Sequence, residues 1–323
     1  MQEKEYKELF SLIQSLIGAG SLTLQECRMI HDFINQRLSE AYNTSQAWPR
    51  YLDVAVEKDV AALKVTGATT TTTINQNYKV FGTKTDGSTI YQGLTTNTIY
   101  IYHEASNSRW TVVSSPSISG SASPYSVSPG VTKAIETATS DTADLVTDVS
   151  AWTTEAGLVF ESISRVPHDS TNIAEFLRIH RKKAFLNSSQ REYDFYVDAE
   201  GANVLNIANT TDNKVYVTSK KPLTLITVTE SGSPAATDYT TAVQADPQGP
   251  TETNIKVPFE FFNFIANGAY ADFLRVERRF EEAGQADFKA QNYLLQELEK
   301  LDIIANNNNL NNKFTTYINR NSR

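Results

Sequence analysis

Residues 257–301, VPFEFFNFIANGAYADFLRVERRFEEAGQADFKAQNYLLQELEKL, decide the fold of this chain. Their apolar side chains recur every three or four residues, which predicts amphipathic helices over 258–280 and about 281–303. The predicted apolar faces comprise Phe259, Phe262, Ile265, Ala266, Ala269, Phe273, Leu274 and Phe280 in the first helix, and Phe288, Tyr293, Leu294, Leu298 and Leu301 in the second. Faces this wide must be buried against other helices.

The N-terminal residues supply matching helices. Residues 3–18 are predicted to form a helix whose apolar side chains lie on one face, and GAG at 18–20 ends that helix. Thr23 and Glu26 have the spacing of a capping box, which predicts a second helix. Pro49 suits the first position of a third helix that would run to about Leu63. Because this segment cannot enclose a core alone, we expect both ends of the chain to form one bundle.

The residues between the ends are typical of strands. Five threonines at 69–73 disfavour helix, and period-two runs at 77–82, 88–93, 97–104 and 109–115 predict a small antiparallel module. A Ser/Pro-rich linker, 114–130, follows it. Further strands are expected at 157–167, 191–201, 203–209 and 214–222, with a short helix over 171–183.

These patterns predict an α+β fold, a helical bundle of N- and C-terminal helices with antiparallel β modules inserted between them. The expected segments are 1–67 (N-terminal helices), 68–130 (inserted β module and linker), 131–256 (central β-rich region), 257–304 (C-terminal helices) and 305–323 (extended arm).

Composition narrows the possible functions. The 323 residues carry a net charge of −8, which argues against a dedicated nucleic-acid binder. One cysteine, Cys27, excludes an intrachain disulfide, and we expect it to be a small buried hydrophobe. We expect no signal peptide and no membrane span, and therefore folding in a cytoplasm.

No catalytic, cofactor-binding or metal-binding residues are predicted. The four histidines, His31, His103, His168 and His180, are isolated from one another. HDS at 168–170 is explained by a turn, and the basic run RIHRKK at 178–183 by exposed cations at a helix end. Two alternatives stay open. A decoration protein could bind host glycan through Tyr91, Tyr100, Tyr102 and Trp110, and a tail-associated hydrolase could use acids that lie far apart in sequence.

The C-terminal segment ANNNNLNNKFTTYINRNSR has no acidic residue. Its asparagines favour turns, so we expect helix to stop near Ile304. Beyond that point we predict a docking arm that orders on a partner with an apolar groove and an acidic rim. The predicted docking residues are Leu310, Lys313, Phe314, Tyr317, Ile318, Arg320 and Arg323.

Three stretches in this order resemble a large family of tailed-phage and prophage structural proteins. The first is INQRLSEAYNTSQAWPRYL at 34–52, and the second is REYDFYVDAEGANVLNIANTTDNKVYVTSKKPL at 191–223. The third is the stretch at 257–301, with its VPF entry and AYAD-LR core. The insert at about 68–150 departs from the family frame and looks like a small β repeat that decorates phage proteins.

The resemblance implies a head-to-tail connector, of adaptor, stopper or tail-completion type, that joins portal to tail in the virion neck. Such proteins form cyclic homo-oligomers, usually twelve- or six-fold, around a channel through which viral DNA passes without specific binding. The implied partners are the portal protein and other neck or tail proteins, with assembly in the cytoplasm of the host bacterium.

Overall fold

The computed structural model describes residues 3–19, 22–104, 109–120, 123–128, 134–139, 157–181, 192–205, 214–227 and 256–321. The chain divides into two compact units. Unit 1 combines Met1–Leu52 with Leu223–Arg323, and unit 2 is Asp53–Pro222. The two ends of the chain therefore build one unit, and the β-rich middle is inserted between them, as the sequence predicts.

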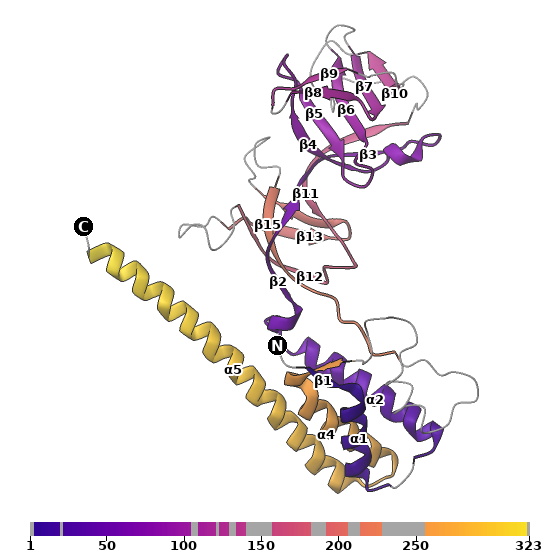
Figure 1. Ribbon diagram of the computed structural model, residues 1–323, viewed down its shortest axis with the longest axis vertical. Helices are drawn as coiled ribbons and strands as arrows, with labels where there is room; N and C mark the ends of the chain where they lie inside the picture. Colours follow the sequence, from indigo (N-terminus) through magenta and orange to yellow (C-terminus); the bar gives the residue numbers. More distant parts are fainter. Residues whose placement is uncertain are drawn as a thin grey trace. The chain divides into compact units, whose positions relative to one another are not determined.

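Helices dominate the described part of unit 1 (Figure 1). They are α1 (Tyr6–Ile17), α2 (Leu24–Asn43), α4 (Phe259–Val276) and α5 (Phe280–Asn321), with the short 3-10 helix η1 (Pro49–Tyr51). The strands β1 (Glu3–Glu5) and β16 (Lys256–Pro258) pair antiparallel and lead directly into α1 and α4. Helix α4 packs against α1, α2 and α5, so it forms the centre of the bundle.

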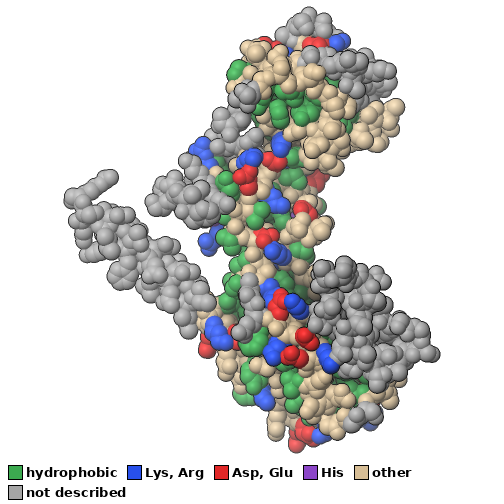
Figure 2. Space-filling model, viewed as in Figure 1, with side chains coloured by type: hydrophobic (Ala, Val, Ile, Leu, Met, Phe, Trp, Pro, Cys, Tyr) green, Lys and Arg blue, Asp and Glu red, His purple; other side chains and the backbone are tan. Residues whose placement is uncertain are grey.

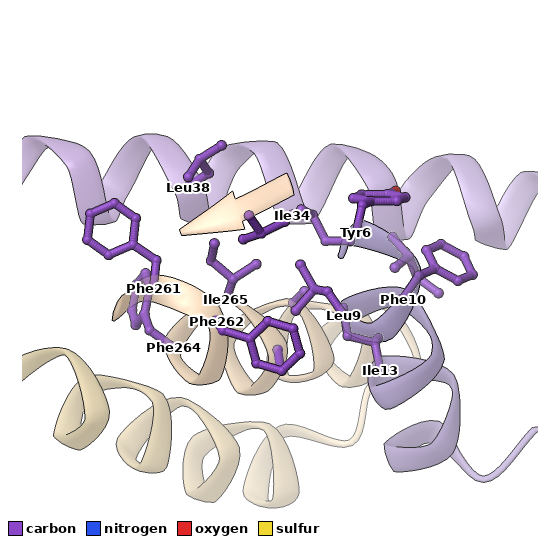
Figure 3. Packing of buried hydrophobic residues seen from close by; sticks show 14 of the residues in the cluster. Tyr6, Leu9, Phe10, Ile13, Ile34, Leu38, Phe261, Phe262, Phe264 and Ile265 are labelled. Carbon is purple, nitrogen blue, oxygen red and sulfur yellow. The ribbon is translucent and has the colours of Figure 1, made fainter. Parts of the chain in front are cut away.

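The core of unit 1 is built from side chains that come from both ends of the chain. Figure 3 shows apolar residues of α1, α2 and α4 converging on one another. The residues labelled there are Tyr6, Leu9, Phe10, Ile13, Ile34, Leu38, Phe261, Phe262, Phe264 and Ile265. Helix α5 adds Ala290 and Leu294, and Ile226 joins the same cluster. This shared core confirms the predicted bundle, in which Cys27 is buried as expected.

The ends of α1 and α2 follow from local sequence. Gly18 adopts φ 76°, a left-handed conformation that ends α1, and its backbone N–H donates to the carbonyls of Gln14 and Ser15. At the start of α2, the Thr23 backbone N–H donates to Glu26 Oε2 at 2.6 Å, and the Glu26 backbone N–H donates to Thr23 Oγ1 at 3.3 Å. The predicted capping box is confirmed.

Strands dominate the described part of unit 2, and most of them pair antiparallel (Figure 1). Its largest sheet has the order β10-β7-β6-β5-β4-β3-β11-β14-β13. The bounds are β3 (Ala61–Thr66), β4 (Asn77–Thr83), β5 (Thr89–Gly93), β6 (Ile99–Glu104), β7 (Arg109–Ser114), β10 (Ala134–Thr139), β11 (Val159–Pro167), β13 (Phe195–Asp198) and β14 (Gly201–Val204). A three-stranded sheet joins β12 (Glu175–His180), β15 (Lys214–Lys220) and β2 (Leu52–Asp59), and β8 (Ser117–Ser119) pairs with β9 (Ser126–Ser128). The short 3-10 helix η2 (Thr72–Ile74) precedes β4.

Two predicted helices are strands instead. The third N-terminal helix ends as η1 after one turn, and the chain continues into β2 and β3. In β3 the buried residues Ala61, Leu63 and Val65 alternate with more exposed ones, and pairing with β11 and β4 overrides the helix propensity. The segment expected as a helix over 171–183 contains β12, so Arg178 lies in a strand and not at a helix end.

The β module begins earlier than expected. Leu63 and Val65 of β3 share a buried cluster with Tyr78, Trp110 and, from β11, Phe160. The module therefore includes residues on both sides of the predicted boundary at 68, and the units divide after Leu52 and after Pro222.

Helix α5 differs from the expectation in two ways. It continues to Asn321, so the predicted end near Ile304 is wrong. Extending an existing helix requires no new nucleation, and the segment contains no Gly or Pro to stop it. Phe280 and Phe288, assigned to the buried faces, are exposed.

Candidate functional site

The stretches that carry the phage-protein resemblance in unit 1 meet at an aromatic cluster. The rings of Trp48 and Phe261 lie edge to face with centroids 4.7 Å apart, and Tyr51 stacks on Phe261 at 6.2 Å. Trp48 Nε1 donates to the carbonyl of Ala41 at 3.0 Å. Burial raises the pKa of Tyr51 to about 12. These ring contacts hold the WP segment after α2 against the start of α4, which follows the VPF entry.

A buried ion cluster joins α2, α4 and α5. Arg37, 6% exposed, donates from Nε to Asp272 Oδ2 at 2.7 Å and from Nη2 to Asp272 Oδ1 at 2.8 Å. The same guanidinium lies 3.0 Å from Asp287 and 2.9 Å from Glu40. Burial by itself lowers the pKa of Arg37, but the hydrogen bond to Asp272 and the three carboxylates raise it above its usual value.

Gly268 makes room for this cluster. A Cβ atom at position 268 would lie 2.9 Å from Cδ of Arg37, so a larger side chain would displace the guanidinium. Every carboxylate in the cluster has a cationic partner, and Asp272 and Asp287 also bind Arg275. These ion pairs hold α2, α4 and α5 against one another.

In unit 2, the second stretch of the resemblance, at 191–223, contains the β13–β14 hairpin and β15. Arg165 of β11 donates to Asn203 at 2.9 Å and Asp198 at 3.0 Å, and also pairs with Glu200. Gly201 has φ +146°, and a Cβ atom there would lie 2.1 Å from the Val166 carbonyl oxygen. The sequence DAEG therefore makes a tight turn held by a neighbouring strand.

An open groove of about 410 Å³ lies beside this turn. Its charged lining residues Lys64 and Glu200 form an ion pair with each other. Gln76, also in the lining, uses its carbonyl oxygen to accept the backbone N–H groups of Thr95 and Thr96. Lys64, Glu200 and Gln76 thus make structural bonds at the edge of the groove.

The sequence HDS at 168–170 forms a turn, as predicted. Asp169 accepts from the side-chain amide of Asn172 at 2.8 Å and from the Thr171 backbone N–H at 3.2 Å. The Asn172 hydrogen bond lowers the pKa of Asp169. The His168 ring packs at 6.2 Å from Phe176.

The aromatic residues considered for glycan binding serve the β module's own core. Tyr102 and Trp110 are buried, at 0% and 1% exposed. Tyr91 packs against the cluster that contains Trp110, and Tyr100 against the cluster that contains Tyr102. A flat aromatic platform for a sugar ring requires exposed faces, which Tyr102 and Trp110 do not offer.

The predicted docking residues Leu310, Lys313, Phe314, Tyr317, Ile318 and Arg320 all fall within the last part of α5, where the backbone is helical. Arg323 lies outside the described residues. The arm is therefore a helix and not an extended segment.

Sequence reasoning missed the Arg37–Asp272 pair, because its members are 235 residues apart and Arg37 looks like an ordinary surface residue. Gly268 was the available signal, since a glycine inside an apolar helix points to close approach by another group. The exposed pair Phe288 and Leu295 was also missed, although their spacing of seven residues is visible in the sequence.

The charged side chains of the described surface indicate which classes of partner could bind to it. On the face shown in Figure 2, Lys and Arg side chains alternate with Asp and Glu. Among the helices described, none is both long enough and apolar enough to cross a bilayer.

Comparison of the chain with protein-family models, curated proteins and solved structures gave no match.

Proposed function

We propose that this protein is a structural subunit of the head-to-tail connector in a tailed-phage virion, without enzymatic activity. In this proposal, copies of the chain form a cyclic ring that joins the portal to the tail. Viral DNA passes through the ring without specific binding, and the ring assembles in the cytoplasm of the host bacterium.

One observation carries the proposal: the N- and C-terminal stretches that resemble phage neck proteins lie against each other in one core. Trp48 contacts Phe261, and Arg37 of the first stretch binds Asp272 within AYAD of the last. Residues that resemble a family only by chance would have no reason to be partners across the whole length of the chain. Their contacts support treating the N- and C-terminal stretches as parts of one pattern.

The chemistry of the described residues fits a structural role. In unit 1 the buried Arg37 pairs with Asp272 of another helix, and in unit 2 the carboxylates of Asp198 and Glu200 pair with Arg165 of β11. The alternating charges visible in Figure 2 differ from the one-sided basic face of a dedicated DNA-binding domain. The net charge of −8 also fits this role, because an acidic channel wall would let DNA pass with little adhesion.

The tail of the chain is the proposed attachment element. In this proposal the last part of α5 docks on the portal or on a neighbouring neck subunit, with Phe314 and Tyr317 as aromatic anchors. Lys313, Arg320 and Arg323 provide positive charge for an acidic rim on the partner.

Deleting residues 306–323 should abolish docking on the portal ring and leave the melting temperature of the free protein unchanged. The described core of unit 1 reaches Leu301 on α5, so the deletion removes no identified core residue. Co-sedimentation with purified portal rings measures docking, and circular dichroism measures melting. A matched control replaces Asn306 and Asn307 with alanine and should dock normally. Full docking by the truncated protein would show that the tail is not the attachment element.

A further inference from the structure

Asn35 of α2 holds an irregular segment of the chain against the helical bundle. Residues 223–227 adopt neither helix nor strand, and Ile226 within them is buried in the core of unit 1. The backbone N–H of Ile226 donates to Asn35 Oδ1, and Asn35 Nδ2 donates to the carbonyl of Ile226, both at 2.9 Å. A single amide side chain therefore satisfies both backbone polar groups of Ile226.

These two hydrogen bonds fix the orientation of the Asn35 amide. A backbone N–H can only donate and a carbonyl can only accept, so Oδ1 must face the first group and Nδ2 the second. Reversing the amide would set donor against donor and acceptor against acceptor. Nδ2 carries a second hydrogen, and His31 Nε2 lies 3.2 Å from Nδ2.

The orientation of the amide in turn fixes the charge state of His31. Because Nε2 faces the N–H of Asn35, Nε2 must be the unprotonated ring nitrogen that accepts. The other ring nitrogen, Nδ1, lies 2.8 Å from the hydroxyl of the buried Tyr6 and carries the single ring proton. Neutral His31 satisfies both contacts. Protonated His31 does not, because its Nε2–H would face another donor.

The titratable groups on the neighbouring elements were compared with these two contacts. The charged residues of α1 and α4, and those of α2 within one turn of His31, are Lys7, Glu8, Arg28, Asp32, Glu260, Asp272 and Arg275. Those of α4 and Glu8 form ion pairs of their own, and Arg28 and Asp32 are exposed and opposite in charge. Burial raises the pKa of Cys27, so its thiol stays neutral. Residues 223–227 carry no titratable side chain. The direct contacts with Tyr6 and Asn35 therefore decide which charge state of His31 fits.

We infer that His31 and Asn35 form a pH-sensitive latch, which holds residues 223–227 on unit 1 while His31 is neutral and releases them when His31 is protonated. Relief of the donor–donor contact requires the Asn35 amide to turn or to move away. Either movement breaks both hydrogen bonds to Ile226.

The latch closes at high pH and opens at low pH. Histidine ordinarily changes charge between about pH 5 and pH 8, and the half-buried ring of His31 is within reach of solvent protons. Residues 223–227 are where the chain returns from unit 2 to unit 1, so release lengthens one of the two connections between the units. The inference concerns unit 1 alone and does not depend on the proposed function.

Hydrogen–deuterium exchange of the full-length protein, read by mass spectrometry on peptides that cover 223–227, tests the latch. The variant His31→Gln keeps a polar side chain that stays neutral at every pH. Comparing it with the wild type at one pH cancels the intrinsic pH dependence of exchange. The two proteins should exchange alike at about pH 8, and at about pH 5 the wild-type segment should exchange about tenfold faster. Peptides of α4 should show no difference. Equal exchange of the segment at about pH 5, or an acid effect as large in α4, overturns the inference.

Asn35→Asp supplies a second readout, which a merely structural role of Asn35 would not move. The aspartate can accept from the N–H of Ile226, but its second oxygen would face the carbonyl of Ile226 and also His31 Nε2. Protonated His31 can donate to that oxygen, so the pH dependence should reverse. Measured against Asn35→Ala, which has no latch at either pH, Asn35→Asp should protect the segment more at about pH 5 than at about pH 8. Protection that falls with pH, as in the wild type, contradicts the inference.

Discussion

Phe273→Asp and Leu38→Asp should each unfold unit 1. Phe273 of α4 and Leu38 of α2 are 3% and 2% exposed in the shared core. An aspartate at either position would be a buried carboxylate without a designed partner, which costs several kcal/mol. That cost is comparable with the whole stability of a typical domain, about 5–15 kcal/mol. Thermal unfolding followed by circular dichroism should show loss of the cooperative helical transition.

Val276→Asp is the matched control for these variants. Val276 is the last residue of α4 and is 55% exposed, so the same chemical change should leave the melting temperature nearly unchanged. If Phe273→Asp and Leu38→Asp melt like the control, the two ends of the chain do not share a core.

Arg37→Met should destabilise unit 1 by about 3–5 kcal/mol, because it leaves Asp272 and Asp287 partly buried without their main cation. Arg275→Met removes the other cation that binds the same two carboxylates. Arg275 is 41% exposed, so its loss should cost below about 1 kcal/mol. Urea unfolding of both variants measures the difference.

A double variant separates the ion pair from the shape of Arg37. Combining Arg37→Met with Asp272→Leu removes one of the two stranded carboxylates, the more buried one, and should recover part of the lost stability. Equal destabilisation by Arg37→Met and Arg275→Met would contradict the assignment of Arg37 as the central partner.

The sequence predicted correctly those elements in which capping residues and periodicity favour the same structure as the contacts of the folded chain. The capping box at Thr23 marks the start of α2, and the glycine after Ile17 marks the end of α1. The period-two runs between 77 and 115 became β4 to β7. In each case propensity, pattern and turn chemistry favour the same structure.

The wrong predictions have physical causes. In β12, the buried residues Phe176 and Ile179 are three apart, a helical spacing, because a bulge between Phe176 and Arg178 breaks the alternation of the strand. In β2 and β3, long-range pairing outweighs a favourable helix start at Pro49. Neither effect is visible without the neighbouring strands.

The candidate site was predictable only in part. Its segments could be found in the sequence, but the contacts between them could not. Arg37 and Asp272 are 235 residues apart in sequence, and only folding brings them into contact. The exposure of Phe288 was hidden because a helical pattern identifies apolar positions without showing which of two faces is packed.

The most direct test of the proposed function is native mass spectrometry and negative-stain imaging of the purified protein, alone and with purified portal rings. The proposal predicts that portal rings convert the protein into a closed homo-oligomeric ring seated on the portal, with one mass and one symmetry. A protein that stays unassembled with the portal and with every other virion component would contradict it.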